Sequence, residues 1–230
     1  MVRPRFASTV VLVRPEESGG FQILLTRRPE EMRFLGGYYV FPGGTVHEDD
    51  YTARTLARCR GLSADEARRI LGGDYQPEQA LGHWVAVVRE LFEEVGVLLC
   101  ASHPGSEISS PELERKRQAV AQGRISFGAF LESQNLYCDL SKIVYFDHWV
   151  TPEIYSMRFD TRFYLADMPP TQTALACSEQ VTESLWIGPN AALSRAHRYD
   201  FPILPPTTTV LNNLGRFSTW RALQKHFDLH

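Results

Sequence analysis

The sequence predicts an α/β protein that folds as one domain over residues 1–230. Two β-rich runs, residues 6–13 and 21–26, flank a Glu-Glu-Ser-Gly-Gly segment, which is typical of a hairpin. A long helical segment occupies the middle of the chain, and strand candidates return in the second half. A chain of this length can bury one substantial core, and no repeat or linker divides it, so we predict one domain.

The composition narrows the class of protein. Hydrophobic residues make up 43% and charged residues 22%, as in ordinary soluble globular proteins. A net charge of -3 gives no basic surplus for nucleic-acid binding. No apolar run predicts a signal peptide or a membrane span, and the four cysteines are scattered without a CxxC pair. We therefore expect a reduced, cytoplasmic protein that has no membrane or nucleic-acid partner and no zinc or disulfide framework.

Glycine and proline mark the elements of the first half. A short strand, residues 38–41, precedes Pro42-Gly43-Gly44, a sharp turn at which backbone can approach a ligand closely. Residues 51–76 are rich in helix formers, and residues 63–71 form one short helix that ends at Gly72-Gly73. Pro77 suits the first position of a long helix that runs to Val95 and ends at Gly96. A strand over residues 97–100 follows.

The second half alternates helices and strands. A turn-rich loop, residues 102–110, leads to two helices, and three strand candidates come later. Pro189 begins another helix, and two short helices end the chain. The expected helices are residues 111–122, 126–133, 207–214 and 219–227, and the expected strands are residues 142–150, 159–166 and 183–187.

The end of the long helix concentrates negative charge. Glu90, Glu93 and Glu94 fall within an arc of roughly 100° on the helix, opposite an apolar face. Like charges at this spacing cost a few tenths of a kcal/mol per pair, and a hard divalent cation would offset that cost. Arg89, four residues before Glu93, can neutralise part of the charge. Acidic helix faces are more often simply solvated, so the rest of the chain must decide.

Gly44, Asp50 and the segment R-E-L-F-E-E-V-G-V at residues 89–97 resemble the Nudix box, G-x5-E-x7-R-E-U-x-E-E-x-G-U, where U is a bulky aliphatic residue. The second half of the box matches at every fixed position. Asp50 stands where the family has Glu, and 38 residues separate it from Arg89 instead of seven. Counting back seven residues from Arg89 reaches Gly82, so residues 51–81 form an insertion within the box.

This interrupted box is similar to the peroxisomal acyl-CoA diphosphatase branch of the Nudix hydrolases and its bacterial relatives. Segments outside the box are similar too, at residues 24–28, 41–44, 149–153 and 158–163. The resemblance implies a Nudix fold, an α/β/α sandwich with a mixed sheet and C-terminal helices. The insertion is expected to form one or two helices beside the active site. It would either line the acyl or pantetheine end of the pocket or form a dimer contact.

The resemblance also implies roles for the box residues. Glu90 and Glu94 would be the principal ligands of Mg²⁺ or Mn²⁺, Glu93 an additional or water-mediated ligand, and Arg89 their orienting ion-pair partner. Backbone groups of Gly43 and Gly44 would cap the site. Asp50 would either stay near Arg89 or leave the site. Mg²⁺ prefers oxygen to imidazole, so His47 is expected to face solvent.

Residues outside the box are less constrained. Glu179 is the first candidate for the general base, Glu153 is another, Glu183 is more simply a strand residue, and the choice stays open. Trp149 and Trp186 are expected in the core or a pocket wall. At least one arginine near Asp160 could form a structural salt bridge instead of binding phosphate. The candidates for phosphate recognition are Arg27, Arg28, Arg158 and Arg162.

The function implied is a metal-dependent hydrolase of a nucleoside diphosphate linked to another moiety. CoA or acyl-CoA is the first choice, giving 3′,5′-ADP and (acyl-)4′-phosphopantetheine. One alternative is a pyrophosphatase for ADP-ribose, NADH or nucleotide sugars; another is a catalytically silent domain that senses nucleotides. We expect a small-molecule nucleoside-diphosphate substrate and leave a homodimer open. The last three residues, Asp228-Leu229-His230, lack an S-K-L type signal, so a peroxisomal location is not predicted.

Overall fold

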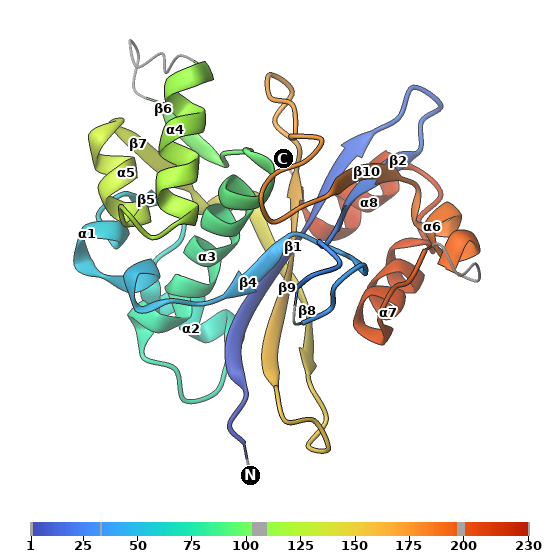
Figure 1. The fold of residues 1–230 in the computed structure, drawn as a ribbon, viewed down its shortest axis with the longest axis horizontal. Helices are drawn as coiled ribbons and strands as arrows, with labels where there is room; N and C mark the ends of the chain where they lie inside the picture. The colour runs from blue at the N-terminus through green and yellow to red at the C-terminus, as the bar shows by residue number, and fades with distance from the viewer. Residues whose placement is uncertain (1, 33, 103–109, 197–200, 230) are drawn as a thin grey trace.

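The computed structural model describes residues 2–32, 34–102, 110–196 and 201–229 and shows a sheet between two layers of helices. In Figure 1 the strands stand in the centre, with α2, α3, α4 and α5 on one side and α6, α7 and α8 on the other. The predicted α/β/α sandwich is therefore confirmed.

The main sheet is mixed, as predicted. Its strand order is β10-β2-β1-β9-β8, with β3 added to β2 and β4 added to β1. The β1·β9 pair is parallel and the other pairs are antiparallel. The strands are β1 (Arg5–Pro15), β2 (Phe21–Arg27), β3 (Tyr39–Val40), β4 (Gly43–Thr45), β8 (Ile143–Val150), β9 (Phe159–Asp167) and β10 (Glu183–Ile187).

Both faces of the sheet are buried. On β1, Val10 and Leu12 pack into the core beneath α3, whereas Val11 and Val13 pack into the core beneath the C-terminal helices. Successive side chains of a strand point to opposite faces, so an unbroken apolar run suits a strand covered on both sides. This run explains why β1 forms the centre of the sheet.

The sheet opens beside the N-terminal half of β1. There β4 pairs with β1 over residues 7–9, whereas β2 pairs with β1 only from Val13 onward. The prediction of a sharp turn at Pro42-Gly43-Gly44 is therefore wrong, because both glycines belong to a strand. A side chain at Gly43 would lie 2.5 Å from the Ser8 carbonyl oxygen, so glycine permits this close pairing.

Helix α3 (Pro77–Val95) has the predicted ends. Pro77 is its first residue, and Gly96 ends it in the left-handed conformation with φ 73°. The alternative of a solvated acidic face does not hold for the described residues, because every residue from Ala80 to Val95 is buried. Three glutamates and an arginine are thus held inside the protein, and this burial needs a chemical explanation.

The insertion forms a small subdomain against the N-terminal half of α3. It contains α1 (Ala53–Leu56), β5 (Cys59–Arg60) and α2 (Ala64–Leu71), and η1 (Glu48–Tyr51) leads into it. The predicted helix α2 is confirmed, and Ser63 and Glu66 cap it reciprocally. Strand β5 was not predicted, since its two residues give no periodic signal.

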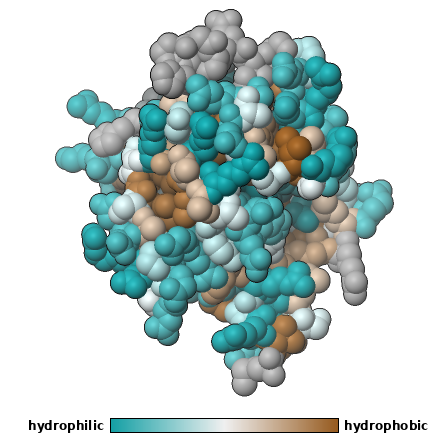
Figure 2. Space-filling view, turned by 90° about the vertical axis from the view of Figure 1, so that its left-hand side faces the viewer, coloured by the Kyte–Doolittle hydropathy of each residue, from teal (hydrophilic) through white to brown (hydrophobic). Residues whose placement is uncertain are grey.

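A second sheet of three strands, β5-β7-β6, lies among α1, α4 and α5 (Figure 1). It adds β6 (Cys100–Ser102) and β7 (Leu136–Asp139) to β5. The predicted strand over residues 97–100 is wrong, since the strand begins at Cys100; the loop predicted over 102–110 falls mostly outside the described residues. The predicted helices α4 (Ser110–Ala121) and α5 (Phe127–Ser133) are confirmed. Figure 2 shows this side as mainly hydrophilic, with small hydrophobic patches.

The C-terminal helices cover the other face of the main sheet. They are α6 (Pro189–Ala196), α7 (Pro205–Leu214) and α8 (Trp220–Phe227), close to the predicted bounds, and a short turn of helix, η2 (Leu140–Lys142), joins β7 to β8. Phe201, Leu211 and Leu223 are fully buried against the sheet. None of the helices in the described ranges is long and apolar enough to span a membrane.

Candidate active site

A cavity of about 580 Å³ lies where the sheet opens, between β4, the end of α3, the β8–β9 hairpin and the start of α7. Glu90 and Glu94 are the only carboxylates among the described residues that line it, and Arg28 is the only basic residue. Most other lining residues are apolar or aromatic: Ala7, Phe34, Leu35, Val40, Phe41, Trp149, Pro152, Tyr155, Met157, Phe159, Phe163, Leu204, Pro205 and Pro206.

The Gly-Gly pair of β4 brings backbone against the two carboxylates. Gly43 donates its backbone N–H to Glu94. A side chain at Gly44 would lie 2.3 Å from Glu90 Oε1, so any larger residue there would displace the Glu90 carboxylate. The prediction that both glycines lie at the site is thus consistent with the geometry, although β4, not a turn, positions them.

Arg89 ties the first half of the box to the second. Its Nε and Nη2 donate to the two oxygens of Asp50, at 2.7 and 3.0 Å, a bidentate pair. Its Nη1 contacts Glu90 Oε1 at 2.8 Å and Glu93 Oε1 at 3.3 Å. Nη2 also donates to the Thr45 carbonyl of β4, at 2.8 Å. Of the two alternatives for Asp50, the structure shows the first, because Asp50 stays with Arg89 and is fully buried.

Burial leaves this carboxylate cluster short of compensating charge. Burial, reinforced by Glu90, raises the pKa of Glu94 well above its usual value. Burial also raises the pKa of Glu93 to about 7, although Arg89 opposes the shift. Glu94 Oε2 is buried and has no hydrogen-bond partner among the described residues. Arg89 thus forms ion pairs with three carboxylates, those of Asp50, Glu90 and Glu93. The fourth carboxylate, Glu94, accepts a backbone hydrogen bond from Gly43 and interacts with the more distant Arg28.

These residues fit a hard divalent cation. Glu90 and Glu94 line the cavity, and the Glu94 oxygen without a hydrogen-bond partner among the described residues is the kind of donor that Mg²⁺ or Mn²⁺ takes. In the described ranges, no three His, Cys, Asp or Glu side chains are already arranged around one point, and Glu93 is held by Arg89. Two protein carboxylates with several waters would suffice for Mg²⁺.

The structure separates the four candidate arginines. Arg28 lines the cavity, with its Nε bonded to the Phe34 carbonyl at 3.2 Å. Arg27 lies outside the cavity and pairs with Glu30 at 3.1 Å. Arg158 donates to the carbonyls of Thr151 and Val2, at 3.0 and 2.9 Å, so it ties the hairpin to the N-terminal segment.

Arg162 lies on the opposite face of the sheet from the cavity. It pairs with Asp160 at 2.5 Å and donates to the Tyr75 hydroxyl at 2.9 Å, on the α3 side. Neither Arg158 nor Arg162 lines the cavity, and protein groups take several of their donors, although Arg162 Nε has no partner among the described residues. Phosphate recognition by these two arginines stays a prediction that this geometry does not support. The expected structural salt bridge near Asp160 is present.

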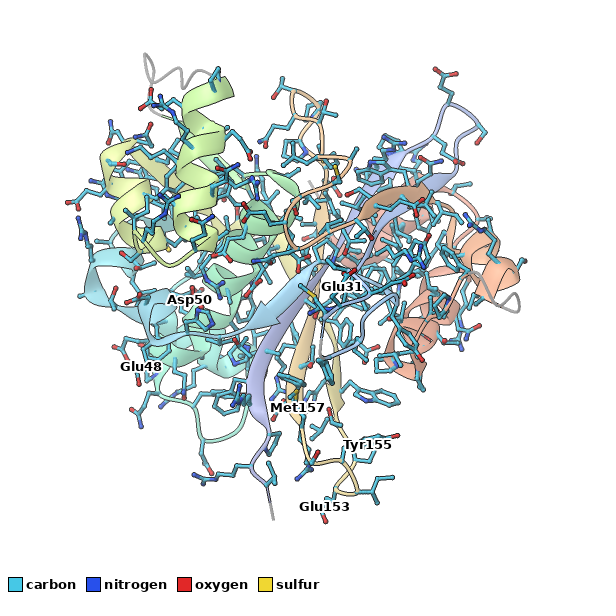
Figure 3. The ribbon with its side chains drawn as sticks, viewed as in Figure 1. Glu31, Glu48, Asp50, Glu153, Tyr155 and Met157 are labelled. Atoms are coloured by element: carbon cyan, nitrogen blue, oxygen red, sulfur yellow. The ribbon has the colours of Figure 1, made fainter. Side chains whose placement is uncertain are left out.

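The candidates for the general base do not reach the cavity. Glu179 is exposed and lies 3.5 Å from the Gln122 side-chain nitrogen, whereas its neighbour Gln180 lines the cavity. Glu153 is exposed on the β8–β9 hairpin (Figure 3). Glu183 accepts a hydrogen bond from the Tyr39 hydroxyl at 2.6 Å, as a strand residue would. The assignment of Glu179 stays a prediction.

The remaining residues follow the predictions in part. His47 is exposed, as expected, with Nε2 2.9 Å from the Thr45 hydroxyl. Trp149 lines the cavity, whereas Trp186 stacks beneath Arg14, with 4.3 Å from the guanidinium carbon to the ring centre. No described residue of 51–81 lines the cavity. The structure therefore gives no support to the alternative that the insertion lines the acyl or pantetheine end of the pocket, and its role stays open. The insertion packs mainly against the N-terminal half of α3, whereas Glu90 and Glu94 lie near the C-terminal end of that helix.

Sequence reasoning missed the apolar wall of the cavity. Tyr155 and Met157 lie on the hairpin between β8 and β9 (Figure 3), and both line the cavity while 55% and 38% exposed. Ile154 beside them is 87% exposed. The signal was a cluster of large apolar residues in a loop, where apolar side chains have no core to join.

Comparisons with known proteins agree with this geometry. Residues 5–214 match the family described as the NUDT19 Nudix domain. The chain is 26% identical to the acyl-coenzyme A diphosphatases NUDT19 of Gallus gallus and Homo sapiens, over 89% and 92% of its length. It spans 66% and 65% of those proteins. It also resembles the crystal structure of a NUDIX hydrolase from Alicyclobacillus acidocaldarius, with a TM-score of 0.80, 26% identity and coverage of 98% and 97%.

Proposed function

Because this chain belongs to the Nudix hydrolase superfamily, in the family of NUDT19 Nudix domains, we propose that it hydrolyses the diphosphate of CoA or acyl-CoA. The products would be 3′,5′-ADP and (acyl-)4′-phosphopantetheine, and the cofactor would be Mg²⁺ or Mn²⁺. The sequence resemblance to the interrupted-box branch and the similarity to NUDT19 proteins both support this proposal.

One structural observation supports the substrate class most directly. The cavity is lined by two buried carboxylates and by an apolar wall to which the hairpin and the start of α7 contribute. A CoA thioester places its diphosphate between a nucleotide and a pantetheine arm that ends in an apolar acyl chain. ADP-ribose and nucleotide sugars carry a polar sugar at that position, which would leave the apolar wall without a matching group.

The chain's own residues would provide binding and orientation. Glu90 and Glu94 would hold the cation, Arg89 would fix Glu90 and Glu93, and Arg28 would contact a phosphate. The cation, when bound, would neutralise the diphosphate oxygens and help to generate hydroxide from water. Gly43 and Gly44 would allow the substrate to approach the strand backbone, because neither of these two cavity-lining residues of β4 has a side chain.

A substrate panel tests the proposal. Purified protein is incubated with CoA, acetyl-CoA, a long-chain acyl-CoA, ADP-ribose and NADH, each with Mg²⁺ and with Mn²⁺, and the products are separated by chromatography. We expect release of 3′,5′-ADP from the CoA compounds at the highest kcat/KM. Faster cleavage of ADP-ribose or NADH would overturn the substrate assignment. Binding without any cleavage would favour the silent nucleotide sensor.

A further inference from the structure

Three of the four cysteines gather on the small β5-β7-β6 sheet, away from the cavity. Cys138 on β7 lies in register with Cys59 on β5 and with Cys100 on β6. The Sγ atoms of Cys100 and Cys138 are 3.6 Å apart. Cys138 is buried, and Cys59 and Cys100 are half-buried. The scattered positions 59, 100 and 138 in the sequence gave no sign of this cluster.

The strand register places Cys100 and Cys138 in a geometry suited to a disulfide. Strands β6 and β7 are antiparallel, and Asp139 donates its backbone N–H to the carbonyl of Leu99. The neighbouring pair, Cys100 and Cys138, is therefore a non-hydrogen-bonded pair, whose Cα atoms lie about 4.5 Å apart. That separation is within the range of roughly 4.4–6.8 Å that a disulfide spans.

We propose that Cys100 and Cys138 form a reversible cross-strand disulfide, with Cys59 as a neighbouring thiol that is not part of the bond. Half-buried Cys100 would react first with a low-molecular-weight disulfide, forming a mixed disulfide and releasing one small thiol. Cys138 would then attack the Cys100 sulfur and release the second small thiol. The two protein thiols lose two electrons and two protons, and one small disulfide becomes two thiols.

Burial gives the two cysteines different roles in this sequence. Hydrogen bonding with Cys100 and Cys59, together with burial, raises the pKa of the Cys138 thiol well above its usual value. A thiol of this kind is a poor first nucleophile, but it lies against the Cys100 sulfur and needs no diffusion to resolve a mixed disulfide. In the described part of the chain, no three such side chains are arranged to hold a metal, so oxidation is favoured over metal binding.

The test is incubation of the full chain with oxidised glutathione, followed by alkylation in denaturant and peptide mapping by mass spectrometry. We expect a peptide pair joined through Cys100 and Cys138, the loss of two of the four titratable thiols, and full reversal by dithiothreitol. Exposed Cys177 offers a matched control, because Cys177→Ser should form the same bond at the same rate. Cys59→Ser should form it as well.

Two further variants distinguish the first reaction, at Cys100, from the second, in which Cys138 attacks the mixed disulfide. Cys100→Ser should form no intramolecular disulfide, and Cys138→Ser should stop at glutathione attached to Cys100. If the buried Cys138 variant fails to fold, the half-buried Cys100 variant still carries the test. A Cys59–Cys138 bond, modification of Cys177 alone, or four free thiols after oxidation would each overturn the proposal. None of the three clustered cysteines lines the cavity in the described chain, so a negative result here leaves the diphosphatase proposal standing.

Discussion

Replacing Glu94 with Gln should have opposite effects on activity and stability. Glu94 is 4% exposed, and its Oε2 has no hydrogen-bond partner among the described residues. As a proposed metal ligand, its loss should lower kcat/KM by at least ~10²-fold, or about 2.7 kcal/mol of transition-state stabilisation. Without metal, removing this buried carboxyl group, which is costly to ionise, should raise the free energy of unfolding by about 1–3 kcal/mol at pH 8.

The pH dependence of the free energy of unfolding should also show the effect of the Glu94 carboxyl group. Burial raises the pKa of Glu94 in the folded protein, so the unfolded chain releases this proton more readily. Wild type should therefore lose stability as the pH rises above the unfolded carboxyl value of about 4.3, and Glu94→Gln should lose less.

Urea unfolding with and without metal provides the assay. In EDTA, Glu94→Gln should be more stable than wild type. Mg²⁺ at ~100 times its Kd should stabilise wild type by about 2.7 kcal/mol and leave the variant nearly unchanged. Exposed Glu78 on the same helix is the matched control, and Glu78→Gln should match wild type within ~1 kcal/mol in both conditions. Full activity in Glu94→Gln, or equal metal stabilisation of both proteins, would refute the reasoning.

Three further predictions concern other parts of the molecule. Arg28→Ala should raise KM about tenfold for CoA and clearly less for a substrate without the 3′-phosphate, such as dephospho-CoA; equal increases measured in initial-rate assays would assign Arg28 to the diphosphate. Met157→Ser should raise KM for a long-chain acyl-CoA by several-fold but not for ADP-ribose, and an unchanged ratio would remove the hairpin from substrate binding. Burial lowers the pKa of His83 to about 3, so wild type should lose about 1.4 kcal/mol of stability per pH unit below pH 6.5, and urea titrations of His83→Gln should show a shallower slope.

The elements that sequence could predict are those with local signals. The ends of α3 follow from Pro77 and Gly96, which restrict the backbone wherever they occur. Strand β4 was misread because Gly43 and Gly44 have low strand propensity, and their strand character comes from pairing with distant residues 7–9 of β1. Long-range pairing of this kind leaves no periodic pattern in the segment itself.

The candidate site could also be predicted only where its residues follow a local pattern in the sequence. The box named the carboxylates and Arg89, because their spacing is fixed along one helix. It could not say which arginines reach the cavity, since that depends on which face of a strand each residue occupies. Arg162 lies one residue from Thr161, which lines the cavity, yet its side chain points to the other side of the sheet. A shift of one residue decides between phosphate binding and a structural salt bridge.

The insertion begins and ends at the same place in the fold, so it does not separate the two halves of the box in space. Asp50 is the last box residue before the insertion, and η1 holds it through the His47 backbone N–H, at 2.8 Å. The next residue, Tyr51, packs against Gly82 so closely that a side chain there would lie 2.9 Å from the ring. Gly82 is also the residue that lies seven positions before Arg89. The ends of the 51–81 insertion therefore meet, and Asp50 reaches Arg89 as it would in a continuous box.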